Sequence, residues 1–535
     1  MKNKIIPPGD SRLDNNKNLK WNILFAILSG ALLILSFPKY GSGFVAWFAF
    51  IPLLFALYRV TSIRQAILLG FITGVVSYTG IVYWIAYVVV NYGYLPIYLG
   101  IIIMLLLACY LSVYLAIFAA GIVYFRRKIP LYLIAPVLWI CLEYCKSQFF
   151  TGFPWENLGY SQYLNLYLIQ FADILGVFGL SFLIILVNVS LFEIINKRSK
   201  REYIIAAAVV LTLSSVYIYG IFRVNNIDDL LQNPSTPSME VSLIQGNIDQ
   251  SIKWNENFQK ETLNIYEDIS IKNIPAIGGL IVWPETAVPF NFQDENDLRR
   301  QIINLSIKTK SDLIFGSISY SPRKNYVDFY NSAYFLSPEG EVKGKYDKVH
   351  LVPYGEYVPL RNIFPFIKGL TAGIGDFSTG GGYFPLSAAG RKIGVLICYE
   401  GILPFAARIY KKESAEILVN ITNDAWFGST SAPYQHLSMT IFRAVETRLY
   451  LVRAANTGIS AIVDPRGQIV SQTNIFQKDS LKGKVKFLKI PTFYAKYGDL
   501  LVIVCFVLII FYFFWSLKGR VRNANGKYQY TRNSK

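Results

Sequence analysis

Charged residues are scarce in this chain of 535 amino acids. Asp, Glu, Lys and Arg together make up 16% of it, whereas hydrophobic residues make up 53%. Soluble globular proteins carry about 25% charged residues, so the composition excludes an ordinary soluble protein and indicates membrane-spanning helices. The apolar residues cluster on either side of segment 223–499, whose composition is that of a globular domain.

Cysteine and histidine are rare as well. Only Cys398 of the five cysteines lies in segment 223–499, which excludes a disulfide within that segment. The two histidines, His350 and His436, are not clustered with cysteines, so the sequence offers no structural zinc site. We expect no metal and no cofactor, and we interpret both histidines as hydrogen-bonding structural residues.

The apolar runs predict a polytopic α-helical membrane bundle. A helix needs roughly 20 apolar residues to cross the hydrocarbon core of a bilayer. Eight candidate spans meet or approach this length: 21–38, 44–57, 66–90, 95–125, 131–145, 167–195, 203–222 and 500–517. Hydrophilic residues precede the first span and no small-residue cleavage site follows it, which indicates a retained anchor and not a removed signal peptide.

Basic residues predict the orientation of these spans. Lys and Arg are concentrated in both terminal tails and in alternate loops, which all lie on one side of the membrane if the eight spans alternate. The opposite short loops carry only Lys39 and Lys146. Basic loops face the cytoplasm in membrane proteins. We therefore expect both termini in the cytoplasm and segment 223–499 outside it.

The chain is expected to divide into five parts. These are a cytoplasmic tail, a bundle of seven spans, a water-exposed domain, a C-terminal span and a basic cytoplasmic tail, at residues 1–20, 21–222, 223–499, 500–517 and 518–535. In the water-exposed part, short β-branched runs alternate with helix-like stretches, which indicates an α/β domain. Its 30 basic and 27 acidic residues nearly balance. The net charge of +18 therefore reflects membrane topology and does not indicate nucleic-acid binding.

Three polar residues follow strand-like or hairpin segments in this domain. Cys398 ends the apolar run 393–397, Glu285 follows the run 281–284, and Lys348 comes after a hairpin. Each has a simpler interpretation when taken alone: a buried small residue, a helix cap and a solvated charge. Together, in the order Glu, Lys and Cys, they resemble the carbon–nitrogen hydrolase (nitrilase) superfamily.

Flanking motifs narrow this resemblance to the apolipoprotein N-acyltransferase family, the membrane branch of the superfamily. The motifs are Gln245-Gly246-Asn247-Ile248, Trp283-Pro284-Glu285-Thr286, Cys398-Tyr399-Glu400, Asn423-Asp424-Ala425-Trp426-Phe427-Gly428 and, in the membrane part, Gly152-Phe153-Pro154-Trp155. The resemblance covers nearly the whole chain. It implies an α-β-β-α sandwich for the water-exposed domain, which would lie in the periplasm, and a location in the bacterial inner membrane.

The resemblance also implies a reaction, the last step of lipoprotein maturation. An acyl chain would pass from a phospholipid to Cys398 as a thioester, and then to the amino group of the diacylglyceryl-cysteine of an apolipoprotein. Glu285 suits a general base that takes the thiol proton, and the Lys348 cation suits stabilisation of the oxyanion. Supporting positions are Glu356, which can orient Lys348 or the incoming amine, and Tyr399, Glu400 and Trp254, for which simple packing is the alternative.

Some alternatives stay open at this point. Segment 360–377, apolar among glycines, is either a mobile arm at the membrane surface or an ordinary capping loop. Asp173, inside a span, is either functional or a capping or pairing residue. A membrane-tethered amidase or nitrilase would use the same thioester, although one span would suffice as its tether. A transporter or scaffold with an inactive domain is disfavoured, because Glu285, Lys348 and Cys398 are all present.

Overall fold

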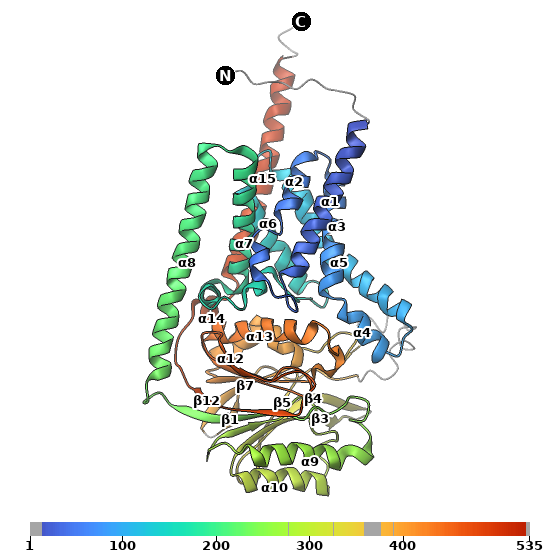
Figure 1. Cartoon of the computed structure of the whole chain (residues 1–535), viewed down its shortest axis with the longest axis vertical. Helices are drawn as coiled ribbons and strands as arrows, with labels where there is room; N and C mark the ends of the chain where they lie inside the picture. Colours follow the sequence, from blue (N-terminus) through green and yellow to red (C-terminus); the bar gives the residue numbers. More distant parts are fainter. Residues whose placement is uncertain (1–12, 277, 325, 358–375, 389, 531–535) are drawn as a thin grey trace.

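A bundle of helices stands on an α/β domain in the computed structural model of the chain (Figure 1). The structure describes residues 13–276, 278–324, 326–357, 376–388 and 390–530. The segment expected as an arm, 360–377, lies outside the described residues except for its last two positions.

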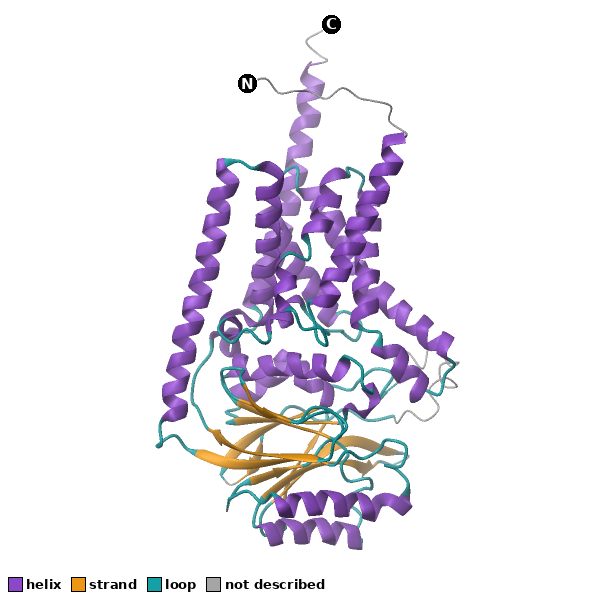
Figure 2. Cartoon of the chain, viewed as in Figure 1, coloured by secondary structure: helices purple, strands orange, loops and turns teal. Residues whose placement is uncertain are grey.

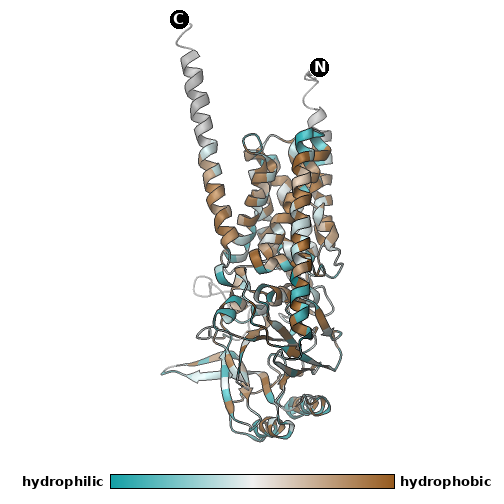
Figure 3. Ribbon diagram, turned by 90° about the vertical axis from the view of Figure 1, so that its left-hand side faces the viewer, coloured by the Kyte–Doolittle hydropathy of each residue, from teal (hydrophilic) through white to brown (hydrophobic). Residues whose placement is uncertain are grey.

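Nine α-helices form the bundle and its flanks within the described ranges. They are α1 (Leu13–Leu35), α2 (Ile51–Arg59), α3 (Ile63–Ile81), α4 (Trp84–Asn91), α5 (Ile97–Phe125), α6 (Leu131–Gln148), α7 (Ala172–Lys197), α8 (Lys200–Gln232) and α15 (Leu500–Tyr530). Short 3₁₀ turns join some of them: η1 (Gly43–Trp47), η2 (Leu158–Gln162) and η3 (Leu168–Phe171). Apolar residues dominate the bundle (Figure 3).

Each of the eight expected spans overlaps at least one of these helices, but they differ in length. Three segments are long and apolar enough to cross a membrane, Ile97–Phe125, Leu168–Lys197 and Lys200–Gln232. The α3–α4 pair would be a fourth if it counts as one span, and it is bent by 53°. Shorter apolar helices cover Leu19–Leu35, Gly43–Arg59 and Leu500–Ser516. The chain is therefore a membrane protein by its helices, while the number of eight spans stays a prediction.

Small residues let α3 and α5 pack closely. A Cβ atom added at Gly70 would lie 2.4 Å from the carbonyl oxygen of Leu115, and one added at Gly74 would lie 2.6 Å from the Cβ of Ser112. In lipid, association of helices depends on such close packing. The two glycines therefore fix the distance between these helices.

The α/β domain contains two six-stranded sheets (Figure 2). The first has the order β12-β1-β2-β3-β4-β5, with strands Asp479–Lys486, Ser238–Gln245, Leu280–Val282, Asp312–Pro322, Val327–Leu336 and Val342–Asp347. The second has the order β11-β10-β9-β8-β7-β6, with strands Ile469–Gln472, Ala461–Val463, Tyr450–Ala455, Ile417–Thr422, Arg391–Ile397 and Leu386–Ala388. Neighbouring strands β1, β2 and β3 run parallel, as do β7, β8 and β9.

Helices cover the outer faces of both sheets. Helices α9 (Glu256–Lys272) and α10 (Asp297–Thr309) lie on the first sheet, whereas α12 (Pro404–Lys412) and α13 (Ala432–Thr447) lie between the second sheet and the bundle (Figure 1). In β2, Ile281 packs with α9 and α10, while Leu280 and Val282 pack in a core shared with the second sheet. That core continues into the bundle, so the domain is packed directly against the membrane helices.

Asp173, at the start of α7, pairs with arginines from two other elements. Its Oδ2 accepts hydrogen bonds from Arg448 Nη2 at 2.7 Å and from Arg223 Nε at 2.8 Å, and its Oδ1 accepts one from Tyr219 at 2.7 Å. Arg448 follows α13, and Arg223 lies in α8. Asp173 is therefore a pairing residue that joins the bundle to the α/β domain. Helix α8 runs on to Gln232, beyond the expected end of its span at residue 222.

Candidate active site

Cys398 lies at a sharp turn at the end of β7. Its backbone φ is +53°, in the left-handed region that costs a non-glycine residue about 1–3 kcal/mol. A short 3₁₀ turn, η4 (Cys398–Ile402), follows at once. Asn420 holds the turn, because its Nδ2 donates to the carbonyl oxygen of Leu396 at 2.9 Å and to that of Cys398 at 3.3 Å. Cys398 itself is half-buried at this turn.

Two carboxylates and a lysine meet beside this turn. Lys348 Nζ lies 2.7 Å from Glu356 Oε2. Asn331, on β4, links both carboxylates: its Nδ2 is 2.7 Å from Glu285 Oε1 and 2.8 Å from Glu356 Oε1. The other oxygen of Glu285 accepts the backbone N–H of Asn423 at 2.8 Å. Lys348 is 1% exposed and Glu285 6% exposed, so the cluster is closed off from bulk water.

Burial and charge set the protonation of this cluster. Burial is the main cause that raises the pKa of the Cys398 thiol; the Glu285 charge adds to it, and the Lys348 charge opposes it. Burial also raises the pKa of Glu285, against the Lys348 charge. For Lys348, burial acts to lower the pKa, but the charges of Glu356 and neighbouring groups outweigh it and raise that pKa. The site therefore contains a protonated Cys398 thiol, a Glu285 carboxylate that binds a proton more readily than usual, and a Lys348 side chain that stays charged.

Glu400 joins the cysteine turn to the segment that carries Lys348. It is fully buried; its Oε2 accepts the N–H of Ile397 at 2.8 Å, and its Oε1 accepts the N–H groups of Val349 at 2.8 Å and His350 at 3.0 Å. Burial raises the pKa of Glu400 to about 7, against the Lys348 charge and these backbone hydrogen bonds. Beside it, the Tyr399 ring stacks on His350 with 5.8 Å between centroids.

Trp254 lies at the edge of the site, and its neighbour Lys253 lies inside it. Trp254 is 44% exposed, with its ring centre 6.0 Å from Lys253 Nζ. Lys253 is 1% exposed and donates to the Thr286 hydroxyl at 2.6 Å and to the carbonyl oxygen of Glu285 at 3.4 Å. Burial lowers the pKa of Lys253 to about 7, against the Glu285 charge. Lys253 thus contacts Glu285 through the backbone carbonyl oxygen of that residue.

His436, on α13, lies beside the Cys398 turn. Its Nε2 is 3.3 Å from the carbonyl oxygen of Cys398, and its Nδ1 is 3.0 Å from both Asp424 Oδ1 and Arg453 Nη2. Asp424 and Arg453 also pair at 2.7 Å. Burial and the Arg453 charge lower the pKa of His436, against Asp424. The ring contacts the carbonyl group of Cys398, so His436 is a hydrogen-bonding residue, as the sequence predicts.

Helix α4 reaches from the bundle to the loop that supports Glu285. The Tyr92 hydroxyl, just after α4, donates to the carbonyl oxygen of Ala425 at 2.8 Å, and its ring packs against Trp426 with 4.9 Å between centroids. Both partners lie in η5 (Asp424–Phe427), directly after Asn423. The membrane part thus contacts the turn that directly follows Asn423, whose N–H bonds to Glu285. Across the described ranges, no cluster of three or more His, Cys, Asp or Glu side chains could hold a metal ion.

Several contributors to the site do not stand out in the sequence. Asn331 occupies an ordinary strand position, and Arg453 comes from a segment whose pairing with Asp424 appears only in the fold. Lys253 had one signal, its place directly before Trp254, which the sequence gives as a supporting position. Glu285, Lys348, Glu356 and the Cys398 turn are brought together as the sequence order suggested, and Glu400 and Tyr399 lie against them.

Comparisons with known proteins match both parts of the chain. Residues 29–190 match the apolipoprotein N-acyltransferase N-terminal domain, and residues 241–488 match the carbon–nitrogen hydrolase family. The chain is 47% identical to an apolipoprotein N-acyltransferase of Geobacter metallireducens, over 90% of this chain and 92% of that protein. It is 36% identical to an apolipoprotein N-acyltransferase of Rickettsia prowazekii, over 71% of this chain and 76% of that protein. Among solved structures, a carbon–nitrogen hydrolase of Helicobacter pylori matches with 18% identity and a TM-score of 0.35, over 46% of this chain and 89% of that one.

Proposed function

This acyltransferase belongs to the apolipoprotein N-acyltransferase family, and from that premise we propose that it acylates lipoproteins by a ping-pong reaction through Cys398. The acyl donor is a phospholipid, and the acceptor is the free amino group of a diacylglyceryl-cysteine at the start of an apolipoprotein. The observation that carries the proposal is the buried cluster of Glu285, Lys348 and Glu356 beside the cysteine turn.

In the first half-reaction, Cys398 attacks the ester carbonyl of the phospholipid. Because the raised pKa of the thiol keeps it protonated, the attack needs a base, and Glu285 accepts the proton. The negative charge that develops on the carbonyl oxygen is stabilised by the Lys348 ammonium. When the intermediate collapses, the bond to the glycerol oxygen breaks, and that oxygen takes the proton from Glu285. The products are a lysophospholipid and a thioester on Cys398.

In the second half-reaction, the lipoprotein amine attacks the thioester. Glu285 takes a proton from the attacking nitrogen, and Lys348 again stabilises the oxyanion. The carbon–sulfur bond breaks, and the leaving thiolate recovers the proton from Glu285. The amide product is formed and the free thiol is restored without any further reactant, so the atoms and charges balance over the cycle.

The neighbouring residues act by keeping Glu285 and Lys348 in place. Glu356 neutralises Lys348 at 2.7 Å, which makes the burial of an ammonium tolerable. Asn331 places one amide nitrogen between two carboxylates that would otherwise repel each other. Glu400 fixes the distance between the Lys348 segment and the cysteine turn. Tyr399 and Trp254 complete the wall of the site.

The contact between α4 and η5 supports a lipid substrate over a small one. A tethered amidase has no need for membrane helices beside its catalytic loop, whereas Tyr92 bonds directly to that loop here. Enclosure of the site also favours transfer to an amine over loss of the acyl group to water.

The orientation is part of the same proposal, with cytoplasmic termini and a periplasmic α/β domain in the inner membrane. The proposal includes the division of the chain into five parts, with boundaries after residues 20, 222, 499 and 517. The basic loop between α5 and α6 supports it by its contacts with the ends of two other helices: Arg126 donates to the carbonyl oxygen of Leu57 at 2.5 Å, at the end of α2, and Lys128 bonds to that of Ser516 in α15. This loop lies with the start of α1 at the end of the bundle remote from the sheets (Figure 1).

A transfer assay tests the proposed function. The full-length enzyme in detergent receives a phospholipid with a labelled acyl chain and a synthetic diacylglyceryl-cysteine peptide with a free amino terminus. We expect the label in an amide on the peptide, and none with Cys398→Ala. Release of labelled fatty acid without peptide acylation would instead identify a hydrolase.

A further inference from the structure

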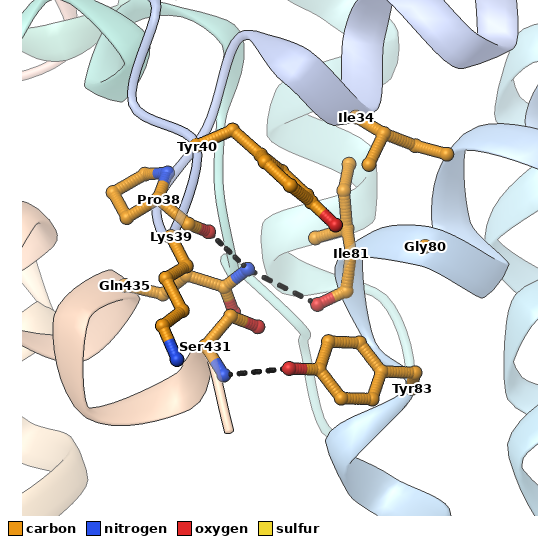
Figure 4. Close-up of a pocket in the computed structure, with 9 residues that line it drawn as sticks. All are labelled: Ile34, Pro38, Lys39, Tyr40, Gly80, Ile81, Tyr83, Ser431 and Gln435. Carbon is orange, nitrogen blue, oxygen red and sulfur yellow. Dashed lines mark hydrogen bonds between the residues drawn. The ribbon is translucent and has the colours of Figure 1, made fainter. Parts of the chain in front are cut away.

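A small pocket opens where the bundle meets the α/β domain. Its volume is about 70 Å³, and it lies between the ends of α1 and α3 and the start of α13 (Figure 4). The residues that line it are Ile34, Pro38, Lys39, Tyr40, Gly80, Ile81, Tyr83, Ser431 and Gln435. None of them belongs to the cluster around Cys398.

Three hydrogen-bond acceptors in and beside this pocket are already occupied. Gln435 Nε2 donates to the carbonyl oxygens of Pro38 at 3.0 Å and Ile81 at 3.1 Å (Figure 4). The Oε1 of Gln435 in turn accepts the indole N–H of Trp155 at 2.8 Å. A ligand that brings further donors would therefore find few partners here.

The donors, in contrast, are available. Ser431 is 3% exposed, and its hydroxyl has no hydrogen-bond partner among the described residues. The Tyr83 hydroxyl accepts the N–H of Ser431 at 2.9 Å, which leaves its own proton for another acceptor. The Lys39 ammonium lies over the Tyr434 ring, 5.9 Å from its centre, at the first turn of α13. A buried polar group without a partner is rare in a folded protein and calls for an explanation.

The pocket also lies at the amino terminus of a long helix. Ser431 is the N-cap residue of α13, which runs for 16 residues, and its hydroxyl makes no capping bond. The first turn of a helix carries a partial positive charge, which attracts anions. In α13 this charge, and not free N–H groups, is the attraction, because the N–H of Ala432 donates to the Thr430 hydroxyl at 3.3 Å and Pro433 has no N–H. The helix, the lysine and the two hydroxyl donors therefore select the same kind of ligand.

We propose that this pocket binds a phosphate group, with Lys39, the Ser431 hydroxyl and the Tyr83 hydroxyl as its donors. The head group of a phospholipid is the favoured source, because the pocket lies at the membrane-facing side of the domain and Ile34 and Ile81 give it an apolar wall. His436, which contacts the carbonyl oxygen of Cys398, lies five residues further along, about 7.5 Å up the same helix. A lipid held here would rest against the helix that supports the nucleophile.

Native mass spectrometry of the full-length chain tests the proposal. Cys398→Ala serves as the background, so that lipid binding is measured without acyl transfer and its failure is distinct from failure of the proposed reaction. The probes are phosphatidylglycerol, a galactosyl diacylglycerol that lacks phosphate, and inorganic phosphate as a competitor. Lys39→Glu and Ser431→Ala remove donors, and Lys496→Glu makes the same charge change at an exposed lysine elsewhere on the junction.

We expect preferential retention of phosphatidylglycerol over the galactolipid. Retention should weaken about tenfold in Lys39→Glu and about threefold in Ser431→Ala, and remain unchanged in Lys496→Glu. Displacement by millimolar inorganic phosphate would assign the pocket to free phosphate, and persistence would assign it to the head group. Equal retention of both lipids, or donor variants that bind like the parent with an unchanged melting temperature, would overturn the proposal.

Discussion

The ammonium of Lys348 and the carboxylate of Glu356 are 2.7 Å apart in a site where Lys348 is almost wholly buried. An isolated ammonium would be costly there, and the paired carboxylate offsets that cost. In the reaction proposed above, this pair would hold the cation in place for the oxyanion. Such preorganisation is a major source of catalytic stabilisation.

Removing the charge of Glu356 should therefore weaken catalysis, and it should also lower the melting temperature because Lys348 stays buried without its nearest charge partner. In Glu356→Gln the hydrogen bond can persist, but Lys348 loses the main charge that raises its pKa. We expect kcat/KM for the lipopeptide to fall about 10–100-fold, the range found for groups that orient a reactive centre. A melting temperature that stays above the assay temperature serves as the control for folding, and activity equal to that of the unchanged enzyme would show that the carboxylate charge has no role.

Asn331 provides a test through pH. Its hydrogen bond favours the ionised form of Glu285 and lowers that pKa. Asn331→Leu removes the bond at similar volume, so the pKa of Glu285 should rise, and the acidic limb of the kcat/KM profile should move to higher pH. A merely structural asparagine would lower activity equally at every pH. Asn331→Asp, which adds a third carboxyl group, should shift the limb in the same direction.

The Asp424–Arg453 pair predicts how stability depends on pH. Burial opposes ionisation of Asp424, but Arg453 and His436 outweigh it and hold the pKa of Asp424 below its ordinary value. A depressed carboxyl pKa contributes stability above the unfolded-state value of about 3.9, and this is lost as pH falls through the folded-state pKa. Asp424→Asn should lower the melting temperature at pH 7 and show a smaller further fall below pH 4. An equal acid sensitivity in both proteins would contradict this assignment.

Asp173 should stabilise the junction between bundle and domain. Asp173→Ala leaves Arg448 buried without its charge partner, which typically costs about 3–5 kcal/mol. We expect faster hydrogen exchange in α8 and after α13, together with a lower melting temperature. The exposed pair of Asp297 and Arg300 is the matched control, because Asp297→Ala should change stability by less than about 1 kcal/mol.

The sequence predicted those parts of the site that depend on strand ends. Glu285 and Cys398 each follow a continuous apolar run that forms a strand, β2 in the first sheet and β7 in the second. It could not predict Asn331. This residue lies inside strand β4, and its role appears only when the fold brings Glu285 and Glu356 to its side chain. Hydropathy also read residues 66–90 as one span, since an apolar run carries no sign of the 53° bend between α3 and α4.

The most direct test is the intact mass of the full-length enzyme after incubation with phospholipid alone. The account predicts that the mass rises by one acyl chain, that hydroxylamine removes the addition, and that peptide mapping places it on Cys398. Cys398→Ala should stay unmodified. Acylation of a lipopeptide by an enzyme that never carries this addition, or an addition that persists in Cys398→Ala, would contradict a thioester at that sulfur.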